Sequence, residues 1–473
     1  MASSAWIRSW TAGWRCAWVL PGLAALAACG ADSPEREAKA PAPTGWNLLY
    51  IVIDTLRADH LGPYGYEPPT SPTLDQFAKR SLVFERAYSA APWTKPSVAS
   101  MFTSLYPPQH RVLSEGTDNQ LALSLTTFPE VLQEHGYRTL AISENPHVQP
   151  QTGFDQGFDR FERVRGYKTF KGHADTGAEK AIRWLGEPSQ DPFFLYLHFL
   201  DPHGPYTPLD EFAGDFLAGL PEESGRRLTK GKVGGMIDGE ELVTQLSEGE
   251  LTYLEALYDA EIREVDAALA TLFAFLSDAG HWENTIVLLT SDHGEEFLDH
   301  GSIRHGYRLY EESVHVPLML ALPGRPAGRI ERVAAQHVDL APTLLTALGL
   351  PVPPVFRGRD LLAAADSPGQ EPDVLLSTDW RDIGRWAVRR GDWKLIVHED
   401  QDRRQLFNLG DDPHEQNDLL TQNPDLVEQL LEAYAHATKP IPGVTPDEAS
   451  GEADASLELE LRGLGYLGGE EED

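Results

Sequence analysis

Carboxylate and imidazole side chains follow directly on two long apolar runs of this sequence. Asp54 follows the run NLLYIVI, and Asp292 with His293 follows TIVLLT and one serine. Oxygen ligands joined by one imidazole suit a hard or borderline divalent cation, such as Ca²⁺, Mg²⁺, Mn²⁺ or Zn²⁺. A single Asp after a strand also occurs as a helix N-cap, whereas adjacent Asp and His followed by Gly294 present two ligands at one sharp turn. These three residues are candidate metal ligands.

A second pattern, Thr94-Lys95-Pro96-Ser97-Val98, has the composition of a helix start. Proline is tolerated in the first turn of a helix because the N–H groups there have no partner. Thr94 then lies among unpaired backbone N–H groups at the positive end of the helix dipole, which stabilises an alkoxide and binds an incoming phosphate or sulfate. A metal ion on the hydroxyl would lower its pKa further, as a hydroxyl nucleophile requires. The residues alone also allow a plain N-cap threonine.

The elements that must position these side chains follow from the hydrophobic pattern. Apolar runs at residues 47–53, 193–199 and 285–290 predict strands buried on both faces. Helical patterns stand at residues 74–81, 97–104, 175–185 and 249–279. Buried strands that alternate with helices predict an α/β fold, with a large, mostly parallel central sheet flanked by helices. The polar residues follow the carboxyl ends of the strands, where open α/β sheets bind ligands.

Two segments depart from the pattern of alternating buried strands and helices. Residues 210–248 are rich in Gly and charge and predict an insertion over the site. Short strand-like pieces at residues 374–377, 386–388, 394–397 and 405–408, followed by a helix at 425–436, predict a small C-terminal antiparallel subdomain. The predicted organisation is a catalytic domain at 46–372, an α+β subdomain at 373–440 and an acidic tail at 441–473.

The N-terminus has the pattern of a targeting segment. Arg8 and Arg15 form a basic region, an apolar run follows, and residues 26–30 read LAACG. This predicts a signal peptide at 1–28, with Cys29 as the lipidated residue of a bacterial lipobox. Residues 29–45 then form the lipidated Cys and a flexible tether. We expect an exported, membrane-anchored lipoprotein that faces the periplasm or cell surface, although cleavage elsewhere would leave Cys29 incidental.

Charge and cysteine content narrow the possible partners. The 473 residues carry a formal net charge of −34. A surface of that sign repels nucleic-acid phosphates, so no nucleic-acid partner is expected. The two cysteines of the chain, Cys16 and Cys29, both lie in the targeting segment. The mature domain therefore contains no disulfide, and the oligomeric state is left open.

Seven segments in series resemble the motifs of the sulfatase family, a branch of the alkaline-phosphatase superfamily. They are residues 47–62 (NLLYIVIDTLRADHLG), 94–107, 201–203 (DPH), 291–294 (SDHG), 305–318, 338–345 (VDLAPTLL) and 406–413. Each motif is weak by itself, but their order and spacing agree with the family over roughly residues 46–440. The resemblance implies an alkaline-phosphatase-like sandwich with a small C-terminal antiparallel subdomain, and an enzyme that hydrolyses small-molecule or glycan esters.

The resemblance also implies roles for individual residues. Asp54, Asp292 and His293 would bind the metal, with Thr94 as nucleophile and fourth ligand. His203 and His305 would contact the ester, one holding its oxygens and the other assisting the leaving group as general acid. Substrate contacts would come from Lys95, as a further positive charge, and from Asn145 and His147, which match a Lys-x-His loop of the family loosely.

Three departures from the family pattern bear on the chemistry. Thr55 stands where sulfatases carry a second acid, and Val98 stands where an arginine supports the nucleophile. Thr94 replaces the cysteine that becomes formylglycine, and oxidation of its secondary alcohol would give a ketone. A formylglycine hydrate expels sulfate from a gem-diol, whereas a Thr ester must be cleaved by water or passed to an acceptor. Superfamily members with Thr here act on phosphorus, so phosphoester chemistry is favoured over sulfate-ester chemistry.

Two other functions are compatible with the sequence. A transferase would move a phospho-substituent to a lipid or glycan acceptor, which a membrane anchor suits. A non-catalytic binding protein on a sulfatase fold would explain Val98 and Thr55, but not the retention of the other polar residues at one site. One metal site is favoured, and a second set comprising Asp201, His203 and His305 is possible.

Overall fold

The structure is a computed structural model that describes most of the chain between residues 44 and 442. The described ranges are 44–114, 119–164, 174–221, 246–367, 374–378 (backbone only) and 384–442, with Leu457 and Leu461 in the tail. The predicted signal peptide, Cys29, nearly all of the tether, most of the acidic tail and residues 222–245 of the predicted insertion lie outside these ranges. Within the described ranges, no helix combines the length and apolar character that a membrane span requires.

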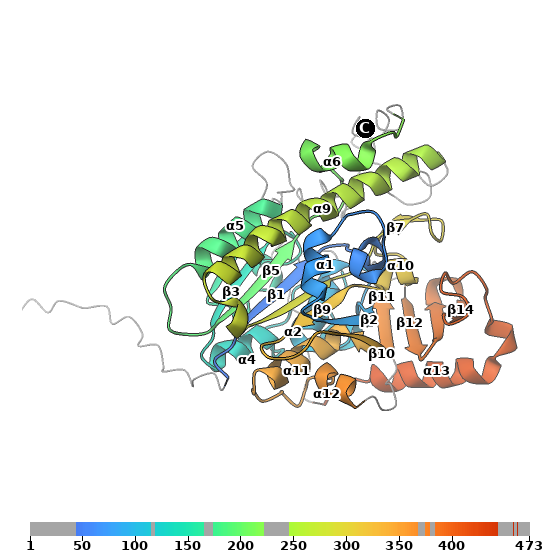
Figure 1. Cartoon of the computed structure of the whole chain (residues 1–473). Coiled ribbons are helices and arrows are strands. Elements are labelled where there is room, and N and C mark those ends of the chain that lie inside the picture. Colours follow the sequence, from blue (N-terminus) through green and yellow to red (C-terminus); the bar gives the residue numbers. More distant parts are fainter. Residues whose placement is uncertain are drawn as a thin grey trace, which may run out of the picture. The chain divides into compact units, whose positions relative to one another are not determined.

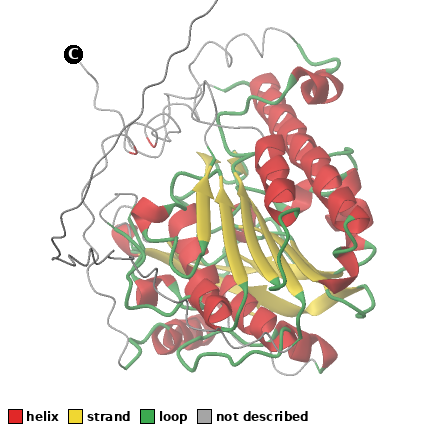
Figure 2. Ribbon diagram, turned by 90° about the vertical axis from the view of Figure 1, so that its left-hand side faces the viewer, coloured by secondary structure: helices red, strands yellow, loops and turns green. Residues whose placement is uncertain are grey.

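An eight-stranded sheet forms the centre of the fold, with strands in the order β10-β2-β9-β6-β1-β5-β3-β4 (Figures 1 and 2). The strands are β1 (Asn47–Ile53), β2 (Leu82–Tyr88), β3 (Arg138–Ser143), β4 (Arg160–Arg163), β5 (Phe193–Phe199), β6 (Thr285–Ser291), β9 (Leu318–Ala321) and β10 (Gly328–Gln336). Only β9 pairs antiparallel with its neighbours in this sheet, so the sheet is mostly parallel. Ile53 pairs with both Phe199 and Ser291, which brings the carboxyl ends of three strands level.

Alternate side chains of the central strand β1 belong to two separate cores, as the two-residue period of a strand requires. Leu48, Tyr50 and Val52 pack with the helices on one face. These are α2 (Thr94–Thr103), α4 (Phe128–Glu134), α11 (His337–Ala347) and α12 (Leu361–Asp366). Leu49 and Ile51 pack with the helices on the other face, namely α1 (Pro72–Ala78), α5 (Ala174–Leu185) and α9 (Glu248–Asp278). Burial on both faces explains the uninterrupted apolar sequence of the strand.

A four-stranded antiparallel sheet follows in the C-terminal part of the chain. Its strands are β11 (Val374–Thr378), β12 (Arg385–Arg390), β13 (Trp393–His398) and β14 (Arg403–Asn408), and α13 (Pro424–Ala437) packs on it. Val388, Leu395 and Leu406 share one core with Tyr106 and Val338 of the preceding part of the chain. The C-terminal sheet is therefore joined to the main sheet's helices by buried apolar contacts.

The remaining elements are short. They are α3 (Pro107–His110), α6 (Asp210–Leu217), α10 (Glu311–Val314) and the two-stranded ribbon of β7 (Glu296–Phe297) and β8 (Ile303–Arg304). The predicted fold class is confirmed, and the bounds of β1 and β5 agree with the predicted strands. The predicted insertion begins with α6, a helix whose pattern the Gly- and charge-rich composition concealed.

Candidate active site

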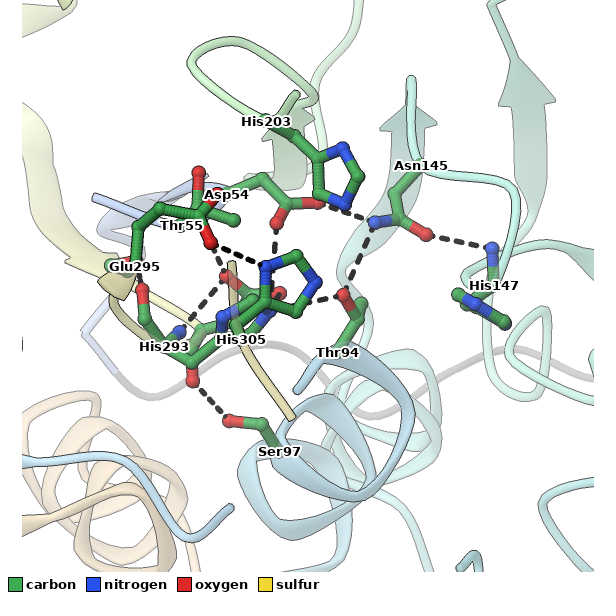
Figure 3. A network of polar contacts seen from close by, with 12 residues as sticks. Asp54, Thr55, Thr94, Ser97, Asn145, His147, His203, His293, Glu295 and His305 are labelled. Atoms are coloured by element: carbon green, nitrogen blue, oxygen red, sulfur yellow. Dashed lines mark hydrogen bonds and ion pairs between the residues drawn. The ribbon is translucent and has the colours of Figure 1, made fainter. Parts of the chain in front are cut away.

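The candidate residues lie at the carboxyl ends of four neighbouring strands, β6, β1, β5 and β3. Asp54 follows β1, Asp292 and His293 follow β6, His203 lies four residues after β5, and Asn145 lies two residues after β3. Because the strands are parallel and adjacent, side chains from four distant segments meet at one edge of the sheet (Figure 3). All of them are buried.

Asp54, His198 and Asp292 offer ligand atoms that lie within 4.8 Å of one another. His198 Nε2 lies 3.7 Å from Asp54 Oδ2 and 3.9 Å from Asp292 Oδ2. His293 adds a second imidazole, with Nε2 3.6 Å from Asp54 Oδ1 and 3.4 Å from Asp292 Oδ2. Among the described residues, neither His198 Nε2 nor Asp292 Oδ2 has a hydrogen-bond partner. Buried polar atoms without partners are costly, and a divalent cation would satisfy both, so these residues fit a metal ion.

The protonation states suit metal binding. Burial lowers the pKa of His198 and that of His293 to about 4 each, so both imidazoles are neutral near pH 7 and present a lone pair. Burial opposes ionisation of Asp292, but His293, His198 and hydrogen bonds from Thr94 and Thr55 keep the pKa of Asp292 below its ordinary value. The charged carboxylate and neutral imidazoles are the ligand forms of these groups.

His198 is a site residue that the sequence analysis did not assign. It lies inside β5, in the run FFLYLHF, and its Nδ1 is 3.0 Å from the hydroxyl of Tyr196. A strand buried on both faces shows no polar alternation, so nothing in the local pattern distinguishes a ligand from a core histidine. The informative signal was a histidine near the end of a strand whose neighbours also end in ligands.

Thr94 is the first residue of α2, and Trp93, with extended backbone at φ −158°, is the N-cap. The interpretation of Thr94 as a plain N-cap is therefore wrong. Thr94 Oγ1 lies 3.4 Å from His293 Nε2 and accepts a hydrogen bond from Asn145 Nδ2 at 3.3 Å. The same Nδ2 donates to Asp54 Oδ2. The hydroxyl is thus held beside the metal-ligand group at the amino end of a buried helix, as Figure 3 shows.

A pair of polar residues fixes this helix to the end of β6. Ser97 Oγ donates to the carbonyl oxygen of Asp292 at 2.5 Å and lies 2.8 Å from His337 Nδ1. His337 Nε2 in turn lies 3.0 Å from the carbonyl oxygen of Ser291. These contacts connect α2, β6 and α11 behind Thr94 and the candidate ligands, so the position of Thr94 relative to Asp292 is set by buried hydrogen bonds.

Gly294 allows the ligand-bearing turn to approach α10. A Cβ atom at this position would lie 2.0 Å from the carbonyl oxygen of Glu312, and the Gly294 N–H donates to the carbonyl oxygen of Ser313 at 2.9 Å. No side chain larger than hydrogen fits so close to a backbone carbonyl. The Asp-His-Gly sequence therefore places two ligands and one close backbone contact in three consecutive residues.

His203 and His305 face the ligand group from two loops. The ring of His305 lies 4.4 Å from that of His293 and 4.9 Å from that of His203, centroid to centroid. His305 Nδ1 is 2.9 Å from Glu295 Oε1, and His203 Nδ1 is 2.5 Å from the carbonyl oxygen of Gly204. Each imidazole thus has its Nδ1 beside an acceptor.

Glu295 completes this arrangement, although the sequence analysis gave it no role. Its Oε2 accepts a hydrogen bond from the Tyr206 hydroxyl at 3.0 Å, while Oε1 contacts His305. Burial opposes ionisation, but His305 keeps the pKa of Glu295 below its ordinary value. The buried carboxylate of Glu295 therefore holds the His305 ring in place through Nδ1.

The three predicted substrate-contacting residues have different surroundings. Asn145 lies between Asp54 and Thr94, and its Oδ1 accepts from the backbone N–H of His147 at 2.7 Å. The His147 ring packs edge-on against Trp93, 6.0 Å between centroids. Lys95 is buried and its Nζ donates to the carbonyl oxygen of Ser114 at 2.9 Å. Substrate contact by all three residues stays a prediction.

Two positions that depart from the family pattern have structural roles of their own. Val98 is buried in the apolar core between α2 and the sheet. The backbone N–H of Thr55 donates to Asp292 Oδ1 at 3.2 Å, and Thr55 adopts a positive φ of 54°. The alternative second metal set of Asp201, His203 and His305 does not form such a group: in the described ranges, only Asp54, His198 and Asp292 place ligand atoms within 4.8 Å of one another.

Comparison with known proteins agrees with this geometry. The family model "Sulfatase" matches residues 46–350, and the model for the C-terminal region of N-sulphoglucosamine sulphohydrolase matches residues 300–437. This chain belongs to the sulfatase family. It is a hydrolase of the sulfatase and alkaline phosphatase superfamily.

Proteins similar to this sulfatase-family chain include both an arylsulfatase and proteins named for phosphorus chemistry. The chain is 27% identical over 470 residues to the multifunctional alkaline phosphatase superfamily protein PehA of Trinickia caryophylli, with 79% of this chain and 91% of that protein covered. It is 25% identical to arylsulfatase K of Bos taurus, with 86% and 84% covered. The phosphonate monoester hydrolase of Agrobacterium radiobacter has the same fold, with a TM-score of 0.67 at 22% identity and 83% and 96% coverage.

Proposed function

We propose that this sulfatase-family hydrolase uses Thr94 as its nucleophile and cleaves phosphoesters in preference to sulfate esters. The observation that carries the proposal is the position of Thr94 Oγ1, 3.4 Å from His293 Nε2 and at the amino end of α2. The substrate would be a small-molecule or glycan ester. The export and lipid anchor predicted from residues 1–45 belong to the same proposal.

In the first step, Thr94 Oγ attacks the phosphorus atom as an alkoxide whose proton has passed to bulk water, and the bond between phosphorus and the alcohol oxygen breaks on the opposite side. The oxygens of the group under attack face the backbone N–H groups in the first turn of α2, which stabilise negative charge. A divalent cation held by Asp54, His198, Asp292 and His293 would lower the pKa of the attacking hydroxyl and offset charge on the ester. Asn145 Nδ2 donates to Thr94 Oγ1 and so orients it.

The leaving alcohol needs a proton, and we assign His305 as its donor. His305 Nδ1 contacts the carboxylate of Glu295, a group that can follow a proton transfer at the ring, whereas His203 Nδ1 contacts the carbonyl oxygen of Gly204. His203 then holds the ester oxygens. In the second step, water attacks phosphorus, the bond to Thr94 Oγ breaks, and neutral His305 takes up the proton from water.

The choice of phosphorus over sulfur follows from the second step. A Thr ester has no second hydroxyl on the same carbon, so sulfate cannot be expelled by collapse to an aldehyde. Release requires attack of water on the bound group, which is the route of phosphatases with a hydroxyl nucleophile. The description of the Trinickia caryophylli relative as a multifunctional alkaline phosphatase superfamily protein supports the same direction.

The test uses matched 4-nitrophenyl esters of phosphate, phenylphosphonate, alkyl phosphate and sulfate with metal-loaded protein. We expect the phosphorus esters to be turned over faster than the sulfate. Thr94→Ala should lose at least about 10³-fold in kcat, in the range of lost nucleophiles, while Thr94→Ser keeps measurable turnover. Thr103→Ala at the other end of α2 is the matched control. Equal activity of wild type and Thr94→Ala would overturn the nucleophile assignment, and faster turnover of sulfate would overturn the preference.

A further inference from the structure

A cavity of about 990 Å³ lies between the loop that follows β7 and the C-terminal sheet. The loop contributes residues 299–302, Tyr307, Arg308 and Tyr310. The sheet contributes Arg385 from β12, His398 from β13 and Arg403 from β14. Figure 1 shows β7 and the C-terminal strands on the same side of the main sheet. The cavity is large enough for a sugar or nucleotide-sized group.

This cavity adjoins the candidate active site through Tyr307. Tyr307 follows His305 by two residues, and its ring packs against Ala91 and Trp93, the residue before the nucleophile. Arg385 Nη1 donates to the carbonyl oxygen of Tyr307 at 2.7 Å, which ties the C-terminal sheet to the same segment. A substrate whose ester lies at Thr94 could therefore extend past Tyr307 into the cavity.

Among the described residues that line the cavity, three are arginines and two carry carboxylates. Both of these carboxylates have cationic partners that do not line it. Asp299 Oδ2 is 3.0 Å from Arg57 Nη1, and Glu415 Oε1 is 2.9 Å from Lys394 Nζ. No carboxylate in the described part of the chain lies within ion-pair distance of Arg403, whose side chain is exposed.

Arg308 and Arg385 add two more guanidinium groups to the same wall. Arg308 Nη1 donates to the carbonyl oxygen of His300, and its Nε is 3.9 Å from Glu296 Oε2. Burial raises the pKa of Glu296 well above its ordinary value, which weakens its ion pair with Arg308. Three guanidinium groups gathered on one wall stand out in a chain of net charge −34.

We propose that this cavity is a second anion subsite, which binds a phosphate, sulfate or carboxylate carried by the same substrate molecule as the scissile ester. Guanidinium groups recognise such oxyanions by paired hydrogen bonds. The preferred substrate is then polyanionic. The inference rests on the proposed function for the position of the scissile ester, but not on whether that ester contains phosphorus or sulfur.

The experiment compares glucose 1,6-bisphosphate with glucose 6-phosphate as probes, using Arg403→Gln and, as matched control, Arg404→Gln. Arg404 is the exposed neighbour on the same strand and does not line the cavity. We expect wild-type protein to show a lower KM for the bisphosphate. Arg403→Gln should raise that KM about tenfold, as loss of one charged hydrogen bond predicts, with kcat and the monophosphate KM unchanged. Arg404→Gln should resemble wild type.

Binding without turnover separates this inference from the proposed function. Calorimetry with the Thr94→Ala protein measures affinity for both probes even if Thr94 is not the nucleophile or phosphate esters are poor substrates. A preference for the bisphosphate that Arg403→Gln removes supports the subsite in either case. Equal affinity of wild-type protein for the two probes, or an equal loss for both probes in Arg403→Gln, would overturn it.

Discussion

Lys394 offers the sharpest test of how the C-terminal sheet supports the catalytic part of the chain. This lysine of β13 is fully buried, and its Nζ lies 2.9 Å from Glu311 Oε1 and 2.9 Å from Glu415 Oε1. Arg389 Nη1 is 3.2 Å from the other oxygen of Glu311. Because Glu311 begins α10, which packs against the turn carrying Gly294, the cluster joins the sheet to the ligand-bearing loop.

The loss of stability expected on removal of Lys394 follows from the ion-pair distances. At 2.9 Å, one pair contributes about 6 kcal/mol of attraction at an effective dielectric constant of about 20. Burial of each charge costs several kcal/mol, so the net value of the cluster is small while it is intact. Lys394→Met removes the attraction and leaves the acids desolvated. We therefore expect a loss of about 3–5 kcal/mol in the free energy of unfolding.

The loss of stability in Lys394→Met should increase as pH rises. Burial opposes ionisation of Glu311, but Lys394 and Arg389 lower its pKa below the ordinary 4.5. In wild type, this stabilisation is present above about pH 4.5 and disappears as pH falls toward the folded pKa. Burial already raises the pKa of Glu415 to about 7 in wild type, with Lys394 opposing the shift. In Lys394→Met, burial dominates, so the pKa of Glu311 rises and that of Glu415 rises further. The acids then destabilise the fold as pH rises, so the difference from wild type is larger at pH 8 than at pH 5.

Urea unfolding followed by tryptophan fluorescence between pH 5 and 8 measures this difference. Lys439→Met, an exposed lysine after α13, is the control for removal of one positive charge. Lys394→Met combined with Glu415→Gln should recover part of the loss because one buried acid becomes neutral. A loss below about 1 kcal/mol, the value of a surface pair, or one that does not change with pH would refute the reasoning.

Four further predictions concern the site and its surroundings. Gly294→Ala should weaken metal binding by more than about tenfold in calorimetric titration, because its Cβ would meet a carbonyl oxygen at 2.0 Å, whereas Gly214→Ala has open space and should not. His110→Asn should flatten the acid dependence of unfolding, measured with urea. Burial lowers the pKa of His110 from 6.5 to about 3. As pH falls through that window, the free energy of unfolding of wild type therefore decreases by up to about 1.4 kcal/mol per pH unit. Cys29→Ser should move the protein from the membrane fraction to the soluble exported fraction. His198→Ala should reduce the bound Mn²⁺ or Zn²⁺ that mass spectrometry detects in purified wild type, and a variant that keeps full metal content would remove His198 from the ligand set.

Sequence patterns predicted most of the framework because the framework is periodic. The bounds of β1 and β5 follow from uninterrupted apolar runs, and the bounds of α9 agree with the prediction to within one residue at each end. The ligands that follow strands, such as Asp54 and Asp292, were found for the same reason. A residue at a strand end is visible in sequence, since the change from apolar to polar marks it.

The residues that escaped prediction act through contacts between distant segments. His198 lies within an apolar strand and becomes a candidate ligand only because β5 is adjacent to β1. Ser97 meets His337 across 240 positions. The direction of the Lys95 side chain, toward the Ser114 carbonyl, depends on its rotamer and not on its place in the motif. Spacing along the chain carries no signal for any of these contacts.

Thr55 and His198 together change the character of the metal site. Where the family pattern has a second carboxylate, this chain has Thr55, and the imidazole of His198 enters from the neighbouring strand, 3.7 Å from Asp54 Oδ2. Exchange of a carboxylate for a neutral imidazole replaces oxygen with nitrogen, which shifts metal preference from Ca²⁺ toward Mn²⁺ or Zn²⁺. It also removes one negative charge beside Thr94. A phosphate monoester carries up to two negative charges near neutral pH and a sulfate monoester only one, so the less anionic site relieves more repulsion for the phosphate. The ligand exchange and the proposed threonine nucleophile therefore favour the same substrate under the proposed function.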